Sequence, residues 1–283
     1  DYNQNGMSDL LAQYGSSYDL NIEMFNRLQH TITGWPGGKP NADDSNRPER
    51  KEPRKKRVII FSPHPDDDVI SMGGTFDRLV SQGHEVHVAY QTSGNIAVSD
   101  QDALKFIEVN SDIIGADHTK TISDLKNAIQ SINNQKPAPK SICNLKASIR
   151  KRESLAATRY IGIPDSQVHF MNLSFYETGT IQKNPFSKKD IDETISLIES
   201  IKPHQIFAAG DLSDPHGTHR VCLNIIFESL KLLKTKKFMN DCWVWLYRGA
   251  WHEWDIHEIE MAVPMSPDQV LRKRKAIFYH QSQ

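Results

Sequence analysis

The amino-acid sequence predicts an α/β fold, a Rossmann-like three-layer αβα arrangement with a mostly parallel sheet. Short runs of β-branched and aromatic residues alternate along the chain with longer segments of helical periodicity. The runs are apolar throughout, which is typical of strands buried on both faces by helices. The chain has 283 residues, enough for one large domain with an appendage.

The first strand–helix–strand unit begins at Val58. Residues 58–61 predict a buried strand, and apolar residues at helical spacing follow over 69–80 and end before Gly83. Residues 85–90 predict the second strand. A strand, a helix and a strand within about 33 residues form a βαβ unit, which requires parallel pairing and a right-handed crossover.

The remaining elements continue this alternation. We expect strands at 168–173, 205–209 and 243–247, and helices over 100–159 (interrupted at 136–139), 191–201, 219–233 and 267–280. Residues 57–283 are therefore expected to form one domain.

Residues 1–56 differ in character from this domain. Helical periodicity over 8–33 predicts a short helical segment, and the polar tract at 41–57 predicts a linker or a segment that follows the surface. The basic cluster at 54–57 is diluted by nearby glutamates and lacks interleaved aromatic residues, so we interpret it as a solvated flank. Because the first residue is not Met, we expect a processed product or part of a longer polypeptide.

Composition excludes several classes of partner. A net charge of −1 provides no global basic field for nucleic acid or a membrane surface, and the apolar runs are too short to span a bilayer. Cys143, Cys222 and Cys242 are odd in number and widely spaced, which predicts isolated thiols. We expect a cytoplasmic protein, and a homo-oligomer is an open alternative to a monomer.

Two polar clusters follow directly after predicted strands, where open α/β sheets place their ligand sites. The first, at 62–68, ends in three consecutive carboxylates, whose mutual repulsion a bound divalent metal would relieve. The second, at 210–219, supplies two imidazoles, His216 and His219, that enter a helix. His64, one carboxylate and His219 would provide three ligands, the number in a catalytic zinc site, and a neighbouring carboxylate would serve as general base.

These motifs resemble those of the PIG-L/LmbE family of N-acetylglucosamine deacetylases. Residues 63–68, followed by Gly73-Gly74, are similar to the family's Pro/Ala-His-Pro-Asp-Asp-Glu signature, and residues 215–219 are similar to its second motif. Residues 150–162 and the C-terminal His280-Gln281-Ser282-Gln283 extend the resemblance, which covers residues 57–283. In one departure Asp68 stands where the family usually has Glu, which changes a contact around the site without removing a ligand.

The resemblance implies a metal-dependent hydrolase acting on the N-acetyl group of an N-acetylglucosamine derivative, a small-molecule amino sugar. It implies that one zinc ion per chain is held by His64, Asp67 and His219. It also implies that Asp66 is the general base that activates the attacking water. His216 matches the histidine that stabilises the oxyanion or protonates the leaving amine. Arg150 falls near the family's substrate-binding arginine, with Arg152 as the neighbouring alternative.

Residues 20–56 resemble the region that joins the two parts of glucosamine-6-phosphate deaminase-like proteins with a C-terminal PIG-L domain. This resemblance implies that residues 1–56 are the tail of an upstream deaminase-like domain. It also admits a phosphorylated amino sugar as the substrate.

Further candidate contacts follow the other strands. Ser93 and Asn95 come after the second strand and are candidates for substrate binding, against the alternative of a plain turn. Arg248 follows the last strand and is a candidate partner for an anionic group. Trp251 and Trp254 are candidates for stacking on a sugar ring, against the alternative of core packing.

Two other functions remain compatible with the sequence. A two-metal phosphoesterase would use extra carboxylate ligands, which Asp66, Asp68, Asp211 and Asp214 offer. A non-catalytic sugar-binding module would use a metal only to shape its pocket.

Overall fold

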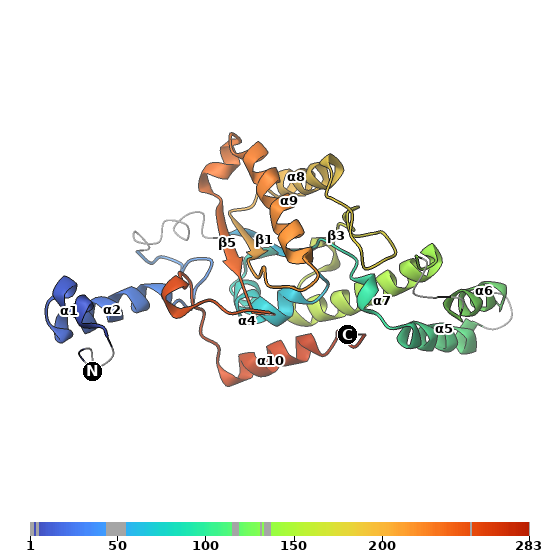
Figure 1. Ribbon diagram of the computed structural model, residues 1–283, viewed down its shortest axis with the longest axis horizontal. Coiled ribbons are helices and arrows are strands. Elements are labelled where there is room, and N and C mark those ends of the chain that lie inside the picture. The colour runs from blue at the N-terminus through green and yellow to red at the C-terminus, as the bar shows by residue number, and fades with distance from the viewer. Residues whose placement is uncertain are drawn as a thin grey trace.

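A five-stranded parallel sheet forms the centre of the computed structural model, which describes residues 3, 6–43, 55–114, 119–130, 132, 137–249 and 251–282 (Figure 1). The strands are β1 (Arg57–Ser62), β2 (Glu85–Tyr90), β3 (Val168–Phe170), β4 (Gln205–Ala209) and β5 (Trp243–Tyr247). Their order is β3-β2-β1-β4-β5, and every pairing is parallel. The predicted Rossmann-like α/β fold is confirmed.

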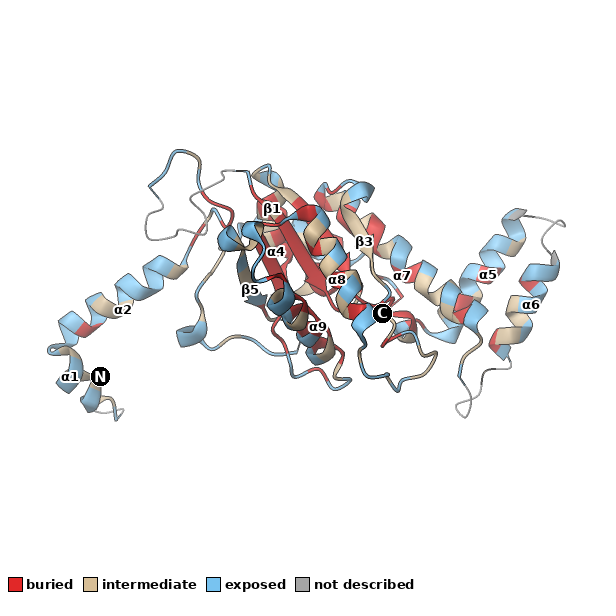
Figure 2. Ribbon diagram, turned by 90° about the horizontal axis from the view of Figure 1, so that it is seen from above, coloured by how far each residue is buried: buried red, intermediate tan, exposed pale blue. Residues whose placement is uncertain are grey.

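Helices cover both faces of the sheet (Figures 1 and 2). One face packs against α4 (Asp67–Ser81), α7 (Lys140–Ile161) and α10 (Pro267–Ile277), and the other against α8 (Lys188–Ile201) and α9 (Thr218–Leu233). Successive side chains of β1 alternate between these layers, since Val58 and Ile60 belong to the first core cluster and Ile59 and Phe61 to the second. Both faces are buried, which is why this strand has no polar alternation in its sequence.

Two helical pairs extend from opposite ends of this body (Figure 2). They are α1 (Ser8–Tyr14) with α2 (Ser17–Thr31), and α5 (Asp100–Ile114) with α6 (Thr119–Gln130). The second pair and the first half of α7 share an apolar cluster of their own. Short 3₁₀ helices complete the elements: η1 (Asn95–Ala97), η3 (Asp165–Gln167), η4 (Lys237–Asp241) and η5 (Ile256–Glu258).

The segment that follows α2 is attached to the body by hydrogen bonds. Thr33 N donates to Ala262 O, and Ala262 N donates to Thr31 O. The Gln205 side chain at the start of β4 donates to Pro36 O at 3.1 Å. Residues 31–38 therefore lie against the body at the amino-terminal end of the sheet.

Two sequence-based expectations are corrected here. The strand expected at 168–173 ends at Phe170, because Asn172 adopts a left-handed φ of 49° that a strand cannot continue through.

The expectation that the basic cluster before β1 is a solvated flank is wrong for Lys56, whose side chain is fully buried. Its backbone N–H donates to the His84 ring at 3.1 Å, and Gly37 lies directly against that ring, so residues 31–38 shield this end of β1. Residues 44–54 of the same tract lie outside the described residues.

The described residues bear on the expectations about the cysteines and about membrane-spanning segments. Cys143, Cys222 and Cys242 are all free thiols. In the part of the chain that is described, no helix has the length and apolarity needed to cross a membrane.

Candidate metal centre and active site

The site lies where the strand order reverses direction. From β1 the chain proceeds through β2 to β3 on one side, whereas β4 and β5 lie on the other side of β1. The loops that leave adjacent parallel strands at this point diverge and leave a crevice between them. The loop after β1 carries residues 63–66 and the loop after β4 carries residues 210–217, so the two predicted motifs meet here.

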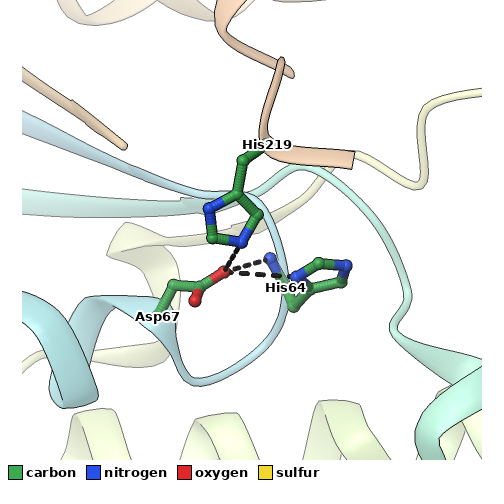
Figure 3. A group of neighbouring side chains, drawn as sticks. All are labelled: His64, Asp67 and His219. Carbon is green, nitrogen blue, oxygen red and sulfur yellow. Dashed lines mark hydrogen bonds and ion pairs between the residues drawn. The ribbon is translucent and has the colours of Figure 1, made fainter. Parts of the chain in front are cut away.

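His64, Asp67 and His219 form a group that fits a metal ion (Figure 3). One ligand atom from each residue lies within 4.8 Å of the others. Asp67 Oδ2 is 3.3 Å from His64 Nδ1 and 3.3 Å from His219 Nε2. Across the described residues, this is the one group of at least three His, Cys, Asp or Glu side chains that converges in this way.

The orientation of the His219 ring supports this assignment. Its Nδ1 lies 3.0 Å from Asp211 O, and because a carbonyl oxygen only accepts, Nδ1 carries the proton. The lone pair of Nε2 then points towards Asp67, and this buried atom has no hydrogen-bond partner among the described residues. A metal ligand histidine is held in the same way, with its second nitrogen bound to a carbonyl group.

Asp67 is ionised at neutral pH. Burial opposes its ionisation, but the favourable interactions with the neighbouring His219 and His64 rings outweigh burial and hold the pKa of Asp67 below its ordinary value. The backbone N–H of His64 also donates to Asp67 Oδ2 at 2.9 Å. Two imidazoles and one carboxylate are a donor set that zinc and several other divalent ions accept.

Asp66 is buried beside this group and lines the same cavity. Burial and, to a smaller extent, the charge of Asp67 raise the pKa of Asp66, Arg150 lowers it, and the net result is a pKa of about 7. Arg150 Nη2 lies 3.4 Å from Asp66 Oδ1 and donates to Pro65 O at 2.7 Å. A buried carboxyl group with a pKa near neutrality is suited to take up and return a proton.

The third carboxylate, Asp68, is buried and lies outside the described wall of the cavity. Its Oδ2 accepts a hydrogen bond from Tyr90 Oη at 2.9 Å, and its backbone N–H donates to Ser62 Oγ at 3.1 Å. Burial raises the pKa of Asp68 to about 7. Asp68 therefore fastens the turn to β1 and β2, and a short side chain suffices for that contact.

The loop after β4 is organised by two further carboxylates. Asp211 Oδ2 accepts hydrogen bonds from the backbone N–H groups of Trp251 and His252, and Asp214 Oδ2 accepts one from Thr218 N at 2.7 Å. Both side chains are buried. They hold the loop against the chain that follows β5 and against the start of α9.

The cavity between these loops has a volume of about 570 Å³. Among the predicted site residues, the wall includes His64, Asp66, Asp67, Arg150, His216 and Trp251. The sequence had not singled out Tyr176, Ile181 and Lys183, which also line it and come from the segment after β3. The rule that sites lie beyond the carboxyl ends of strands would have pointed to that segment.

Other candidate contacts lie elsewhere. Gly94 lines the cavity, but Ser93 N and Asn95 Nδ2 each donate to the Glu177 carboxylate at 3.2 Å, and neither residue belongs to the described cavity wall. The Arg248 guanidinium stacks on the Trp254 ring at 3.6 Å and donates to Gly210 O at 3.1 Å. It too is outside the described wall of this cavity.

Replacing Gly94 by Ala is expected to lower both stability and activity. Gly94 has a φ of 62°, which costs a residue with a Cβ about 1–2 kcal/mol, and that Cβ would lie 2.7 Å from Pro65 Cδ. Because Pro65 adjoins His64 and Asp66, we expect kcat/KM to fall about ten- to hundredfold. Steady-state kinetics and thermal unfolding of the variant test this.

Gly83→Ala is the matched control for this change. Gly83 has a comparable φ of 82°, but no atom lies within 4 Å of the position of its Cβ. We expect a similar loss of stability with unchanged kcat/KM. Equal activity losses in the two variants would show that the contact with Pro65 is irrelevant to the site.

The stretch of the chain that carries His64, Asp67 and His219 is similar to known proteins. The model of the PIG-L family, described as GlcNAc-PI de-N-acetylase, matches residues 59–230. A putative glucosamine-6-phosphate deaminase-like protein of Bacteroides thetaiotaomicron is 54% identical over 292 residues, which cover 100% of this chain and 44% of that protein. The chain thus spans less than half the length of this relative, whose name matches the resemblance drawn from residues 20–56.

Among solved structures, N,N'-diacetylchitobiose deacetylase from Pyrococcus horikoshii, in complex with an inhibitor, superimposes with a TM-score of 0.54 and 20% identity. The superposition covers 93% of this chain and 79% of that protein. At this level of identity the likeness establishes a shared fold.

Proposed function

Because the chain belongs to the PIG-L family of GlcNAc-PI de-N-acetylases, we propose that it is a metal-dependent deacetylase that hydrolyses the N-acetyl group of an N-acetylglucosamine derivative. The products are acetate and the free amino sugar. The observation that carries this proposal is the convergence of His64, Asp67 and His219 beside the buried carboxyl group of Asp66 in one cavity.

In this proposal His64, Asp67 and His219 hold one divalent metal ion, and zinc suits their donor set. When bound, such an ion acts as a Lewis acid towards the acetyl carbonyl group and the attacking water. The ionised Asp67 supplies negative charge to the site, and the Asp211 carbonyl group keeps the His219 ring in the required orientation.

The remaining residues divide the proton transfers between them. Asp66 accepts the proton of the attacking water, and the Arg150 guanidinium at 3.4 Å stabilises the carboxylate before that transfer. His216, on the cavity wall, donates a hydrogen bond to the developing oxyanion or a proton to the leaving amine. Trp251 lines the cavity with its side chain 53% exposed, which leaves its ring available to a sugar.

The alternative of a two-metal phosphoesterase gains no support from the described residues. It needs further carboxylates near the first metal, and Asp68, Asp211 and Asp214 are bound to Tyr90 and to backbone N–H groups. None of these three carboxylates belongs to the group of ligand atoms that converges at His64, Asp67 and His219.

The proposed function is tested by incubating the protein with N-acetylglucosamine and its 6-phosphate and measuring primary amine, acetate and inorganic phosphate. We expect one acetate for each amine and no phosphate, and we expect a chelator to stop the release. Phosphate release without acetate would replace the proposal with the phosphoesterase alternative.

A further inference from the structure

An arginine and a lysine line the cavity, and they differ in the partners that neutralise them. Arg150 is fully buried and forms an ion pair with Asp66. The ammonium group of Lys183 has two recorded contacts, a hydrogen bond of 3.0 Å to Ile181 O and a position 4.3 Å from the centre of the Tyr176 ring. Within the described part of the chain, no carboxylate forms an ion pair with it. Lys183 is therefore the cation on this wall that is left for a ligand.

The backbone around Lys183 is held in place. Thr178 Oγ1 donates to Gln182 O at 2.8 Å, and Asn184 N donates to Phe175 O at 2.9 Å, so residues 175–184 close into a loop on both sides of Lys183. Ala138 N donates to Gly179 O and fixes the tip of this loop to the chain before α7. The position of Lys183 on the cavity wall is thus built into the fold.

The surroundings of the ammonium group favour an anion. Burial lowers the pKa of Lys183, while the charge of Glu177 opposes this, so the group has lost part of its hydration. The Glu177 carboxylate itself accepts hydrogen bonds from Ser93 and Asn95. A partly dehydrated ammonium group gains more from an anionic partner than one in bulk water.

One sugar is long enough to reach from the metal group to Lys183. The Tyr176 ring centre is 6.0 Å from that of His64 and 4.3 Å from Lys183 Nζ. Lys183 Nζ is therefore at most about 10 Å from the His64 ring, comparable with the span of one hexose that carries an N-acetyl group and a phosphate group.

We propose that Lys183 binds a phosphate monoester group of the substrate and thereby makes the enzyme selective for N-acetylated amino-sugar phosphates over neutral amino sugars. This inference rests on the proposed deacetylase function, and it assigns the substrate class to one residue of the same cavity. Lys183 acts on substrate selection, and the acid–base groups at the acetyl end are separate from it.

The test compares kcat/KM for amine release from N-acetylglucosamine, its 6-phosphate and its 1-phosphate. The variants are Lys183→Met, Lys183→Arg and the control Lys188→Met, whose side chain is exposed and paired with Asp192. We expect the wild-type protein to prefer one phosphate ester by about tenfold or more. Lys183→Met should lose this preference through a higher KM for the phosphate ester, so that its kcat/KM for the ester falls to about its kcat/KM for the neutral sugar. Lys183→Arg and Lys188→Met should retain it.

Salt gives a second readout that a purely structural role would not change. The preference of the wild-type protein should decrease as ionic strength rises, and Lys183→Met should show no such dependence. A wild-type protein without preference, or a Lys183→Met variant with the full preference, would overturn the assignment even if both deacetylate well.

Binding of the products separates this inference from the proposed function. If no sugar is deacetylated, calorimetry with glucosamine 6-phosphate and glucosamine still decides the role of Lys183. Tighter binding of the phosphate, lost in Lys183→Met, would support the assignment although the deacetylase proposal had failed. Equal binding of glucosamine 6-phosphate and glucosamine by the wild-type protein would overturn the assignment. Equal binding of glucosamine 6-phosphate by the wild-type protein and by Lys183→Met would overturn it as well.

Discussion

Replacing Asp66 by Asn is expected to lower kcat by about a hundredfold to ten-thousandfold, with little change in KM. Asn keeps the shape of the side chain but cannot accept the proton of the attacking water. The metal ligands are untouched, so the bound metal should remain at the wild-type level. Steady-state deacetylation kinetics, with metal analysis of the same samples, measure both effects.

The stability of the Asp66→Asn variant is the control for this prediction. Arg150 would lose its carboxylate partner, although it keeps the hydrogen bond to Pro65 O. We therefore expect a modest decrease in the melting temperature and a folded, metal-containing protein at assay temperature. Near wild-type turnover in this variant would remove Asp66 from the role of general base.

Replacing His219 by Gln is expected to abolish stable metal binding and, with it, activity. The substitution removes the imidazole nitrogen that faces Asp67 at 3.3 Å and whose lone pair would bind the metal. Loss of a supporting contact alone costs about ten- to hundredfold in metal affinity, so loss of a ligand should cost more. Metal analysis after dialysis should find about one ion per chain in the wild-type protein and almost none in the variant.

His252→Gln is the matched control for the His219 variant. His252 is exposed on the chain after β5, its Nδ1 lies 3.5 Å from Ser213 Oγ, and it is outside the converging ligand group. We expect this variant to retain its metal. A His219→Gln variant that binds metal as well as His252→Gln does would contradict the proposed ligand set.

The fold and the convergence of His64, Asp67 and His219 could be predicted because both depend on short stretches of sequence. The strands expected at 85–90, 205–209 and 243–247 have the bounds of β2, β4 and β5, since each apolar run is flanked by residues that end a strand. This convergence follows from two local motifs and from the rule that parallel strands open their sites at one end. The strand expected at 168–173 is longer than β3, because no glycine marks the left-handed turn at Asn172 in the sequence.

The direction in which loop side chains point was harder to predict. The sequence placed Ser93 and Asn95 at the correct end of β2, but their hydrogen bonds to Glu177 depend on a segment more than eighty residues away. Arg248 likewise turns to Trp254, six residues further along the chain. Tyr176 and Lys183 reach the cavity through a loop that lacks periodicity and is closed by its own hydrogen bonds.

The division of the chain at residue 57 stays a prediction. Residues 31–38 bond to β4 and to residue 262, so this part of the expected appendage belongs physically to the body. Because the Bacteroides relative is more than twice as long as this chain, the activity of the whole protein is also a matter for experiment.

The most direct test of the central claim is a metal titration of activity. The protein is stripped with a chelator, and deacetylation of N-acetylglucosamine and its 6-phosphate is measured as zinc is added in fractions of an equivalent. We predict no activity without metal and a linear recovery that ends at one zinc per chain. Full activity after stripping, or recovery that continues to two equivalents, would contradict a single-metal deacetylase centre at His64, Asp67 and His219.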